Sequence, residues 1–488
     1  MTGTRTGEEH VRSLQDGRAV YLDGKRVEDV TTHPAFRNAV QSAASFYDFQ
    51  GAPENIELMT FAPNGGDRRV SRAWQRSRSY EELVRRRKAL QALARLSYGF
   101  MGRSPDHVAS AITGQIMGIE VFEAYDPKRA RAYMDYYEYA SSNDLFLTYV
   151  IINPQANRSK DWGEQDDELV ARIVDEDSTG VTIRGGKMLG TSAIMANEVF
   201  VANLQPLKPG EEDLAFCCAV PMSASGLQVL SRKSYEAASV SRFDNPLSSC
   251  FDENDALMYF EDVKVPWDRV FVHRDVDMCR AQFHDTPGHI FQNYQAQIRL
   301  SVKLRFLVGM ARKLVEAIGT IVIPSVAEQL GHLAAQANMI EAMLAGMEAN
   351  GEFRGEWYVP NRSQLYAAQV LSQELYPKVV EKIRELAGGS LIMLPSSVDD
   401  FGNEKLRRII RNTQRSDAMS PDERTKFLKA CWDAIGSEFG SRHTQYEMFY
   451  AGAQFVTRGH SFRTYDWDGA KAMVDELLAG YEIGGETA

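Results

Sequence analysis

RLSVKLRFLVGMARKLVEAIGT, residues 299–320, is an unbroken run of helix-forming residues whose apolar side chains recur at the spacing of one helix face. Two further runs of similar character follow it, SVAEQLGHLAAQANMIEAMLAGMEA (325–349) and QLYAAQVLSQELYPKVVEKIRELAGG (364–389). Each run is long enough for a helix that crosses a whole domain. We therefore expect residues 276–488 to form a helical bundle.

The residues before this bundle have a different texture. Residues 149–275 contain six short strand-like runs separated by Gly, Pro, Asp and Asn: ELVARIVDE, GVTIRGGKML, EVFVANL, DLAFCCAVPM, GLQVLS and ALMYFEDVKV. Residues 1–148 have mainly helical patterns, with one hairpin expected where Asp23-Gly24 separates two alternating runs. The order predicts an α+β protein of three domains. This order differs from that of a doubly wound nucleotide fold. The sequence also has no GxGxxG or GxxxxGK[ST] motif after a strand, which such a fold would use to bind phosphate.

The composition narrows the classes of partner. A net charge of −11 over 488 residues argues against nucleic acid. The five cysteines show no metal-binding spacing, so we expect no metal site and a reduced, cytoplasmic setting. The N-terminus lacks the apolar core of a signal peptide, and no apolar run reaches membrane-spanning length. We expect neither a membrane nor a nucleic-acid partner.

A candidate anion site lies in GRSPDHVAS, residues 102–110. Ser104 is placed to cap a helix, and Pro105 suits its first position. Arg103 and His107 then lie four residues apart on roughly the same side, beside free backbone N–H groups. Such a helix end with an added guanidinium suits a phenolate, carboxylate, phosphate or reduced flavin. The local sequence equally allows Arg103 to pair with a neighbouring acid and His107 to be a structural histidine.

Two other polar segments are candidates for a cofactor site. NDLFLTYVIINPQANRSKD (143–161) ends an apolar run in a dense set of hydrogen-bonding side chains at the α-to-β junction. GGKMLGTSAIMANEVFVANL (185–204) combines glycines with the hydroxyls of Thr191 and Ser192. A polar loop and a β turn explain the same segments without a ligand. Asp255 and His289 are further acid–base candidates, each also explicable as structural.

Five motifs carry a resemblance to a known family: GRSPD, TYVIINPQANRS, GGKMLGTSA, NPLSSCFDENDALMYFEDVKVPWDRVFV and SEFGSRHTQYEMFYAGA. The chain resembles the oxygenase component of the two-component, flavin-dependent 4-hydroxyphenylacetate 3-monooxygenases, a family that includes chlorophenol monooxygenases and natural-product tyrosine hydroxylases. The resemblance implies an acyl-CoA-dehydrogenase-like fold: a helical N-terminal domain (1–148), a middle β-barrel domain (149–275) and a C-terminal helical bundle (276–488). It also implies assembly as a homotetramer or homodimer.

The resemblance further implies an FADH2-dependent monooxygenase. A separate NAD(P)H-dependent flavin reductase would supply FADH2, which reacts with O2 to a C4a-hydroperoxide and hydroxylates a phenol or related electron-rich aromatic. The alternatives on this scaffold are an acyl-CoA-dehydrogenase-like oxidoreductase, N-hydroxylation, dehalogenation and a non-catalytic flavin-binding protein. An iron–sulfur dehydratase is disfavoured, because the cysteines are dispersed.

The resemblance also assigns roles to residues. Those expected to act in catalysis and substrate binding are Arg103, His107, Tyr149 and His289. Those expected to bind FAD are Arg103, Tyr149, Gln155, Asn157, Arg158, Thr191, Ala451 and Gly452. The 4-hydroxyphenylacetate enzymes typically have tyrosine at the position of His107 and histidine at that of Tyr149, so the two identities are exchanged. The exchange predicts either a surviving trio with Arg103, its roles traded, or a different substrate.

Overall fold

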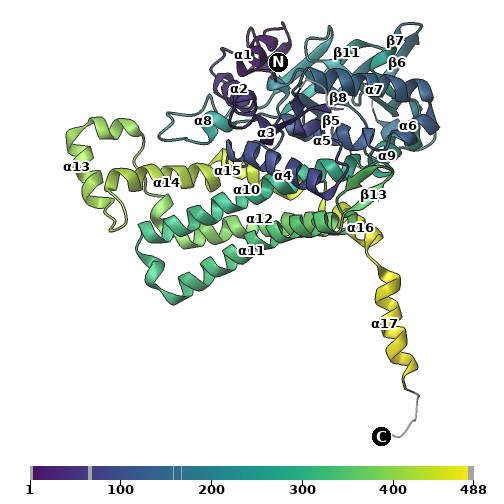
Figure 1. Ribbon diagram of the computed structural model, residues 1–488. Coiled ribbons are helices and arrows are strands. Elements are labelled where there is room, and N and C mark those ends of the chain that lie inside the picture. The colour runs from purple at the N-terminus through teal and green to yellow at the C-terminus, as the bar shows by residue number, and fades with distance from the viewer. Residues whose placement is uncertain (1–3, 64–68, 158, 166–167, 482–488) are drawn as a thin grey trace.

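The computed structural model describes residues 4–63, 69–157, 159–165 and 168–481. The N-terminal helices lie around the β-sheets, and the long C-terminal helices form a separate layer beside them (Figure 1). The helices of the N-terminal part are α1 (Gly7–Ser13), α2 (Arg37–Gly51), α3 (Ile56–Met59), α4 (Tyr80–Arg95), α5 (Pro105–Ile116), α6 (Ile119–Tyr125) and α7 (Pro127–Ser142). Two short strands in the same part, β3 (Thr60–Phe61) and β4 (Val70–Ser71), pair with each other.

The predicted hairpin is confirmed. Strands β1 (Ala19–Leu22) and β2 (Lys25–Val27) pair antiparallel across the turn. Asp23 and Gly24 have φ angles of 51° and 74°, the left-handed values that a type I′ turn requires at both central positions. Strand β1 also pairs in parallel with β10 (Leu227–Ser231), so the hairpin extends the larger β-sheet.

The six predicted strand-like runs are all strands, and together with neighbouring segments they form two sheets. The larger sheet has the order β2-β1-β10-β11-β7-β6, and the smaller has the order β12-β9-β8-β5. The remaining strands of these sheets are β5 (Leu147–Val150), β6 (Arg172–Asp177), β7 (Gly180–Lys187), β8 (Glu198–Val201), β9 (Phe216–Pro221), β11 (Ala256–Pro266) and β12 (Val270–His273).

The closed β-barrel expected for the middle of the chain is not seen among the described residues. The larger sheet ends at β2 and β6, and the outer side chains there are charged and exposed, including Lys25 and Arg26 on β2 and Glu176 and Asp177 on β6. Closure into a barrel requires the two outermost strands to pair. Exposed charges on edge strands oppose such pairing, so the sheet stays open.

The three predicted long helices are confirmed as α10 (Gly288–Ala317), α11 (Pro324–Ala349) and α12 (Arg362–Ala387). They share an apolar core with α14 (Pro421–Ile435) and α15 (Glu438–Phe449). Helix α12 ends at Ala387, and its C-cap Gly388 has a φ of 53°, a left-handed value that favours glycine at the end of a helix. The other elements of this half are α8 (Ser248–Phe251), α9 (Val276–His284), β13 (Glu352–Arg354), β14 (Trp357–Val359), α13 (Glu404–Thr413), α16 (Gln454–Thr464) and α17 (Trp467–Ala479).

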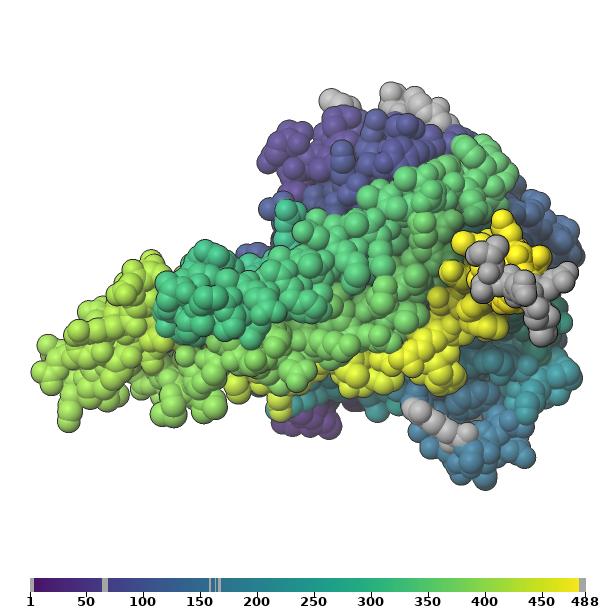
Figure 2. All heavy atoms as spheres, turned by 90° about the horizontal axis from the view of Figure 1, so that it is seen from below, coloured from purple at the N-terminus to yellow at the C-terminus, as the bar shows by residue number. Residues whose placement is uncertain are grey.

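Two segments project from the main body. The arm formed by α13 and α14 protrudes on one side (Figure 2), and α17 extends away from the rest of the chain (Figure 1). None of the residues of α17 is buried. Among the described helices, none is both long enough and apolar enough to cross a bilayer.

Helix α5 is enclosed on all sides by the rest of the protein. It can therefore hold the candidate site at its N-terminus in a fixed position. Every residue from Asp106 to Ile116 is buried, and the helix packs along α10. A Cβ atom added to Gly114 would lie 2.5 Å from the carbonyl oxygen of Pro287, just before α10 begins. Only glycine permits this approach of two backbones.

We predict that Gly114→Ala destabilises the protein by about 1–3 kcal/mol, because the backbone of α5 or of Pro287 must move to admit the methyl group. Gly309→Ala is the matched control, since a Cβ at this α10 position meets no atom within 4 Å. The control should be neutral or stabilising by up to about 1 kcal/mol. Urea unfolding midpoints of the two variants measure the difference, and equal midpoints would contradict the close-approach argument.

Candidate active site

The side chain of Arg103 lies where α5, β5 and the end of α15 meet. Its Nη1 is 2.6 Å from Nε2 and 3.2 Å from Nδ1 of His107, and its Nη2 donates to the carbonyl oxygen of Tyr450 at 3.3 Å. The guanidinium carbon lies 5.3 Å from the ring centre of Tyr149 and 5.2 Å from that of Tyr446. Arg103 is only 8% exposed, so these groups surround nearly all of its charge.

The direction of this side chain explains how a cation is tolerated at the start of a helix. Helix α5 begins at Pro105 with Ser104 as its N-cap, as predicted, although the Ser104 hydroxyl donates to the Asp106 carboxylate instead of capping the backbone. Arg103 extends away from this end to the Tyr450 carbonyl, just past the last residue of α15. The C-terminus of a helix carries partial negative charge, which stabilises a guanidinium.

The surroundings keep Arg103 charged. Burial by itself lowers the pKa of a guanidinium, but the neighbouring Tyr149, Tyr446 and Glu253 raise the pKa of Arg103 above its ordinary value. Glu253 acts through the main chain as well, because its Oε2 accepts the backbone N–H of Arg103 at 2.8 Å. The site therefore holds a permanent positive charge inside the protein.

His107 and Tyr149, the two residues whose identities we expected to be exchanged, both contact Arg103. The rings of His107 and Tyr149 stack with centres 5.5 Å apart. The Tyr149 hydroxyl accepts a hydrogen bond from Gln292 at 3.2 Å, and Nδ1 of His107 is 2.8 Å from Oε1 of Gln295. The sequence analysis missed both glutamines, although they lie three residues apart in the segment after His289. Only the fold brings this part of α10 against α5.

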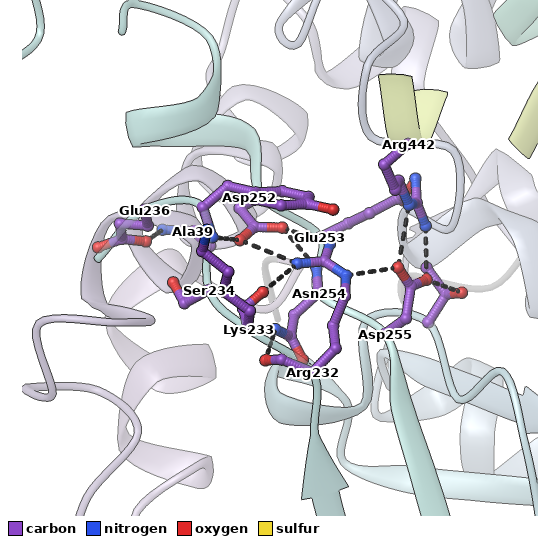
Figure 3. A network of polar contacts seen from close by, with 12 residues as sticks. Ala39, Arg232, Lys233, Ser234, Glu236, Asp252, Glu253, Asn254, Asp255 and Arg442 are labelled. Atoms are coloured by element: carbon purple, nitrogen blue, oxygen red, sulfur yellow. Dashed lines mark hydrogen bonds and ion pairs between the residues drawn. The ribbon is translucent and has the colours of Figure 1, made fainter. Parts of the chain in front are cut away.

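A buried ion-pair network holds the backbone beside Arg103 (Figure 3). Arg442 of α15 donates to Glu253 at 2.5 Å and to both carboxylate oxygens of Asp255, at 2.5 and 2.9 Å. Figure 3 shows Asp255 between the guanidinium groups of Arg442 and Arg232. One arginine of the bundle thus fixes two carboxylates of the segment that leads into β11.

Asp255 pairs with two arginines, Arg442 and Arg232. The sequence allowed it to be either an acid–base group or a structural residue. Burial raises the pKa of a carboxyl, but the charges of Arg442 and Arg232 hold the pKa of Asp255 below its usual range. Asp255 also accepts a hydrogen bond from the hydroxyl of Thr191 at 2.7 Å. The carboxylate therefore stays ionised and positions Thr191.

Three other expected cofactor residues, Gln155, Asn157 and Arg158, follow β5 in the chain. Gln155 and Asn157 are exposed, and Asn157 accepts hydrogen bonds from the N–H and hydroxyl of Ser159. Arg158 lies outside the described residues. The start of the loop after β5 is fixed by Lys187, a buried residue that the sequence analysis missed, whose Nζ donates to Asn153 at 2.6 Å.

The bundle places Ala451 and Gly452 directly after Tyr450. Gly452 has a φ of 96°, and its carbonyl oxygen accepts a hydrogen bond from Gln373 at 2.8 Å. Ala451 is half-buried and Gly452 is exposed. The turn that contains both residues therefore follows the carbonyl group that contacts Arg103.

His289 of α10 lies in a second cluster of aromatic side chains, which it forms with Tyr366, His284 and His460. Its Nδ1 is 3.1 Å from the Tyr366 hydroxyl, and its ring centre is 4.8 Å from that of His284 and 5.2 Å from that of His460. His289 precedes Gln292 by three residues along α10, which corresponds to roughly 4.5 Å of helix rise. His289 is buried, and its described contacts are with this cluster and not with the groups around Arg103.

Polar groups that could bind a ligand lie in the loop after β5 and in the segment after β7. Thr191 is held against β5, since the Thr148 hydroxyl donates to its carbonyl oxygen at 2.7 Å. Ser192 Oγ and Asn153 Nδ2 are buried and have no hydrogen-bond partner within the described part of the chain. Buried polar atoms are normally paired, so these two are available to a polar ligand. With the exposed Gln155 and Asn157, they form a set of hydrogen-bonding groups of the kind that could hold a polar cofactor such as FAD.

Comparison with solved structures places this architecture in a known class. The chain superposes with a TM-score of 0.93 on the oxygenase component of 4-hydroxyphenylacetate 3-monooxygenase complexed with FAD and 4-hydroxyphenylacetate, at 29% identity, covering 98% of this chain and 99% of that one. A 4-hydroxybutyryl-CoA dehydratase from N. maritimus gives a TM-score of 0.88 at 18% identity, covering 99% and 97%. The mixed α/β fold is therefore one that this flavin-binding oxygenase shares with the dehydratase.

Sequence comparison narrows the class to one family. The family models described as 4-hydroxyphenylacetate 3-hydroxylase N terminal and C terminal match residues 6–272 and 279–479. The chain is 35% identical to the 4-hydroxyphenylacetate 3-monooxygenase oxygenase component of Klebsiella oxytoca, covering 99% of this chain and 94% of the relative. It is also 35% identical to the 4-nitrophenol 2-monooxygenase oxygenase component of a Rhodococcus species, covering 99% and 93%. The chain belongs to the 4-hydroxyphenylacetate 3-hydroxylase family.

The ion-pair network gives a stability prediction. Arg442→Met leaves the buried Glu253 and the half-buried Asp255 without their shared partner, which costs about 3–5 kcal/mol. The matched control is Arg411→Met, which removes an exposed bidentate pair with Asp422 and should cost at most about 1 kcal/mol. Thermal unfolding of both variants measures the difference. An Arg442→Met protein as stable as the control would contradict the claim that Arg442 stabilises the fold by pairing with Glu253 and Asp255.

Proposed function

We propose that this chain is the oxygenase component of a two-component, reduced-FAD-dependent monooxygenase that hydroxylates phenols. The observation that carries the proposal is the buried guanidinium of Arg103, whose side chain contacts an imidazole, two tyrosine rings and a carbonyl group. No carboxylate is among these side-chain partners within the described residues. The nearby Glu253 carboxylate binds the backbone N–H of Arg103 and does not contact its guanidinium. A buried guanidinium with no carboxylate in direct contact favours an anionic ligand, and a phenolate oxygen matches it.

Arg103 would act on the oxygen of the substrate. Loss of the phenolic proton places negative charge on that oxygen and on the ring carbons beside it, and a fixed guanidinium stabilises the charge as it develops. The rings of Tyr149 and Tyr446 flank the guanidinium and exclude water from it. Thr191 and Asn153, with Gln155 and Asn157, would hold the cofactor next to this position.

Reduced FAD, when bound, supplies the electrons that activate O2 for transfer of one oxygen atom to the ring. The relatives' description as oxygenase components supports a separate flavin reductase as the source of reduced FAD. The two relatives also suggest the substrate class. Both names describe a para-substituted phenol attacked at the carbon next to its hydroxyl group. That carbon is one on which phenolate charge accumulates, so we propose para-substituted phenols, hydroxylated beside the hydroxyl.

The test of this function follows the oxygen atom. Purified chain is mixed with FAD, a flavin reductase, NADH and 18O2, and offered 4-hydroxyphenylacetate or 4-nitrophenol. We expect a catechol that carries one 18O atom, and Arg103→Met should lower its rate of formation by about 100-fold or more. Arg85→Met, at an exposed position of α4, is the matched control and should retain full activity.

The same assay separates hydroxylation from displacement of a substituent, because nitrite release from 4-nitrophenol is measured independently. Unlabelled products with every phenol, or an Arg103→Met protein as active as the control, would contradict the proposal.

We further propose that copies of this chain assemble as a homotetramer or homodimer through the C-terminal segment. Helix α17 has a large exposed apolar surface, in which Trp467, Met473, Val474, Leu477 and Leu478 are 46%, 74%, 55%, 67% and 51% exposed. A stripe of this size on a projecting helix is typical of a surface covered by another chain. A second copy would cover it, in keeping with the closed assemblies that most soluble oligomers form.

Replacing both Met473 and Leu477 by Glu should convert the assembly to smaller species, since the charges would have to be buried at the interface. Light scattering coupled to size-exclusion chromatography measures the mass. Val240→Glu, at a 65% exposed position outside α17, is the control and should leave the mass unchanged. A monomeric wild type, or an unchanged mass in the double variant, would rule out this interface.

A further inference from the structure

Behind His107, a chain of three buried side chains leads away from Arg103. Nδ1 of His107 is 2.8 Å from Oε1 of Gln295, and Nε2 of Gln295 donates to Oδ2 of Asp106 at 3.0 Å. His107, Gln295 and Asp106 are each no more than 2% exposed. Asp106 accepts, in turn, from the Ser104 hydroxyl at the start of α5.

We infer that Gln295 is a positioning residue that fixes the proton of His107 on Nδ1, so that His107 serves Arg103 as a neutral hydrogen-bond acceptor. In this role the histidine neither gives nor takes a proton during the reaction. The inference rests on the proposed function for its catalytic meaning, and it identifies what His107 does there.

The Arg103 guanidinium sets the direction of every hydrogen bond in this series of side chains. An arginine side chain has only donors, so the ring nitrogen nearest to it, Nε2 at 2.6 Å, must accept. A neutral imidazole that accepts at Nε2 carries its proton on Nδ1, which then donates to an oxygen. Gln295 must therefore present its Oε1 to His107 and its amide nitrogen to Asp106. No other orientation of the amide satisfies all three contacts.

The charges around the ring also favour the neutral form. Burial lowers the pKa of His107 well below its ordinary value, and the positive charges of Arg103 and Arg299 lower it further, whereas the hydrogen bond to Gln295 acts in the opposite direction. The groups that face the ring are Arg103 from the segment before α5, Gln295 and Arg299 from α10, and the Tyr149 ring from β5. Asp106 reaches it only through Gln295.

A neutral acceptor has a specific advantage here. A carboxylate in place of the imidazole would orient Arg103 equally well, but it would cancel the charge that the phenolate needs. A neutral imidazole fixes the guanidinium and leaves its charge available. By the same reasoning, position 295 requires a neutral amide, because a carboxylate there would stabilise an imidazolium, which cannot accept from Arg103.

The test uses the full-length protein with 15N-labelled histidine. The ring nitrogens of His107 are assigned by comparison with a His107→Asn protein, and their spectra are recorded without substrate or turnover. We expect a neutral ring protonated on Nδ1 from about pH 5 to about pH 8, the range in which a free histidine changes its charge. A ring protonated on Nε2, or an imidazolium in this range, would overturn the inference. This readout is independent of activity, so it stands or falls separately from the proposed function.

Two variants extend the test. Gln295→Glu should raise the pKa of His107, and kcat/KM with 4-nitrophenol should then fall about tenfold per pH unit below that pKa. Gln295→Leu should lower kcat about 10-fold or more with little change in KM, because an unfixed ring no longer orients Arg103.

Gln369→Leu is the matched control, since Gln369 is a fully buried glutamine of α12 whose amide atoms have no hydrogen-bond partner among the described residues. It should keep the wild-type pH profile and kcat. If Gln295→Glu leaves the titration of His107 unchanged, or if Gln295→Leu behaves like the control, Gln295 has no positioning role.

Discussion

A positive charge is buried next to the start of α5, and the surrounding architecture is organised to hold it. The N-terminus of a helix repels a cation, and burial removes the water that would otherwise stabilise it. Arg103 is kept charged by groups from three distant parts of the chain: the Glu253 carboxylate before β11, the Tyr149 ring on β5 and the Tyr450 carbonyl after α15. The bundle and the sheets must therefore be docked correctly for the site to exist. Arg442 links the two, because it binds both Glu253 and Asp255.

The structure gives a physical setting for His107 and Tyr149, the pair whose identities we expected to be exchanged. The two rings stack against each other, and both lie beside the guanidinium, so one imidazole and one phenol still accompany Arg103. Their partners differ, however. The phenol of Tyr149 accepts from Gln292, whereas the imidazole of His107 faces Gln295. The trio with Arg103 is in contact, and its hydrogen-bond directions are set by two glutamines of α10.

Local patterns in the sequence were sufficient for the parts of the fold that local chemistry determines. Asp23-Gly24 indicated the hairpin, six short strand-like runs bounded by turn residues indicated strands, and Ser104-Pro105 indicated the start of α5. The open sheet was not predicted, because closure depends on how distant edge strands meet. For the site, Arg103 could be singled out from its helix end, but Gln295 and Arg442 could not. Their partners lie 188 and 189 residues away in the chain, and no spacing rule connects them.

The central claim is that the guanidinium of Arg103 receives the oxygen of a phenol. A crystal structure of the protein with reduced FAD and 4-nitrophenol, obtained without O2, tests this claim most directly. We predict that the phenolic oxygen lies within about 3 Å of a guanidinium nitrogen of Arg103, the distance of a charge-assisted hydrogen bond. A phenol bound with its oxygen elsewhere, while Arg103 keeps only its contacts to His107 and Tyr450, would contradict the account.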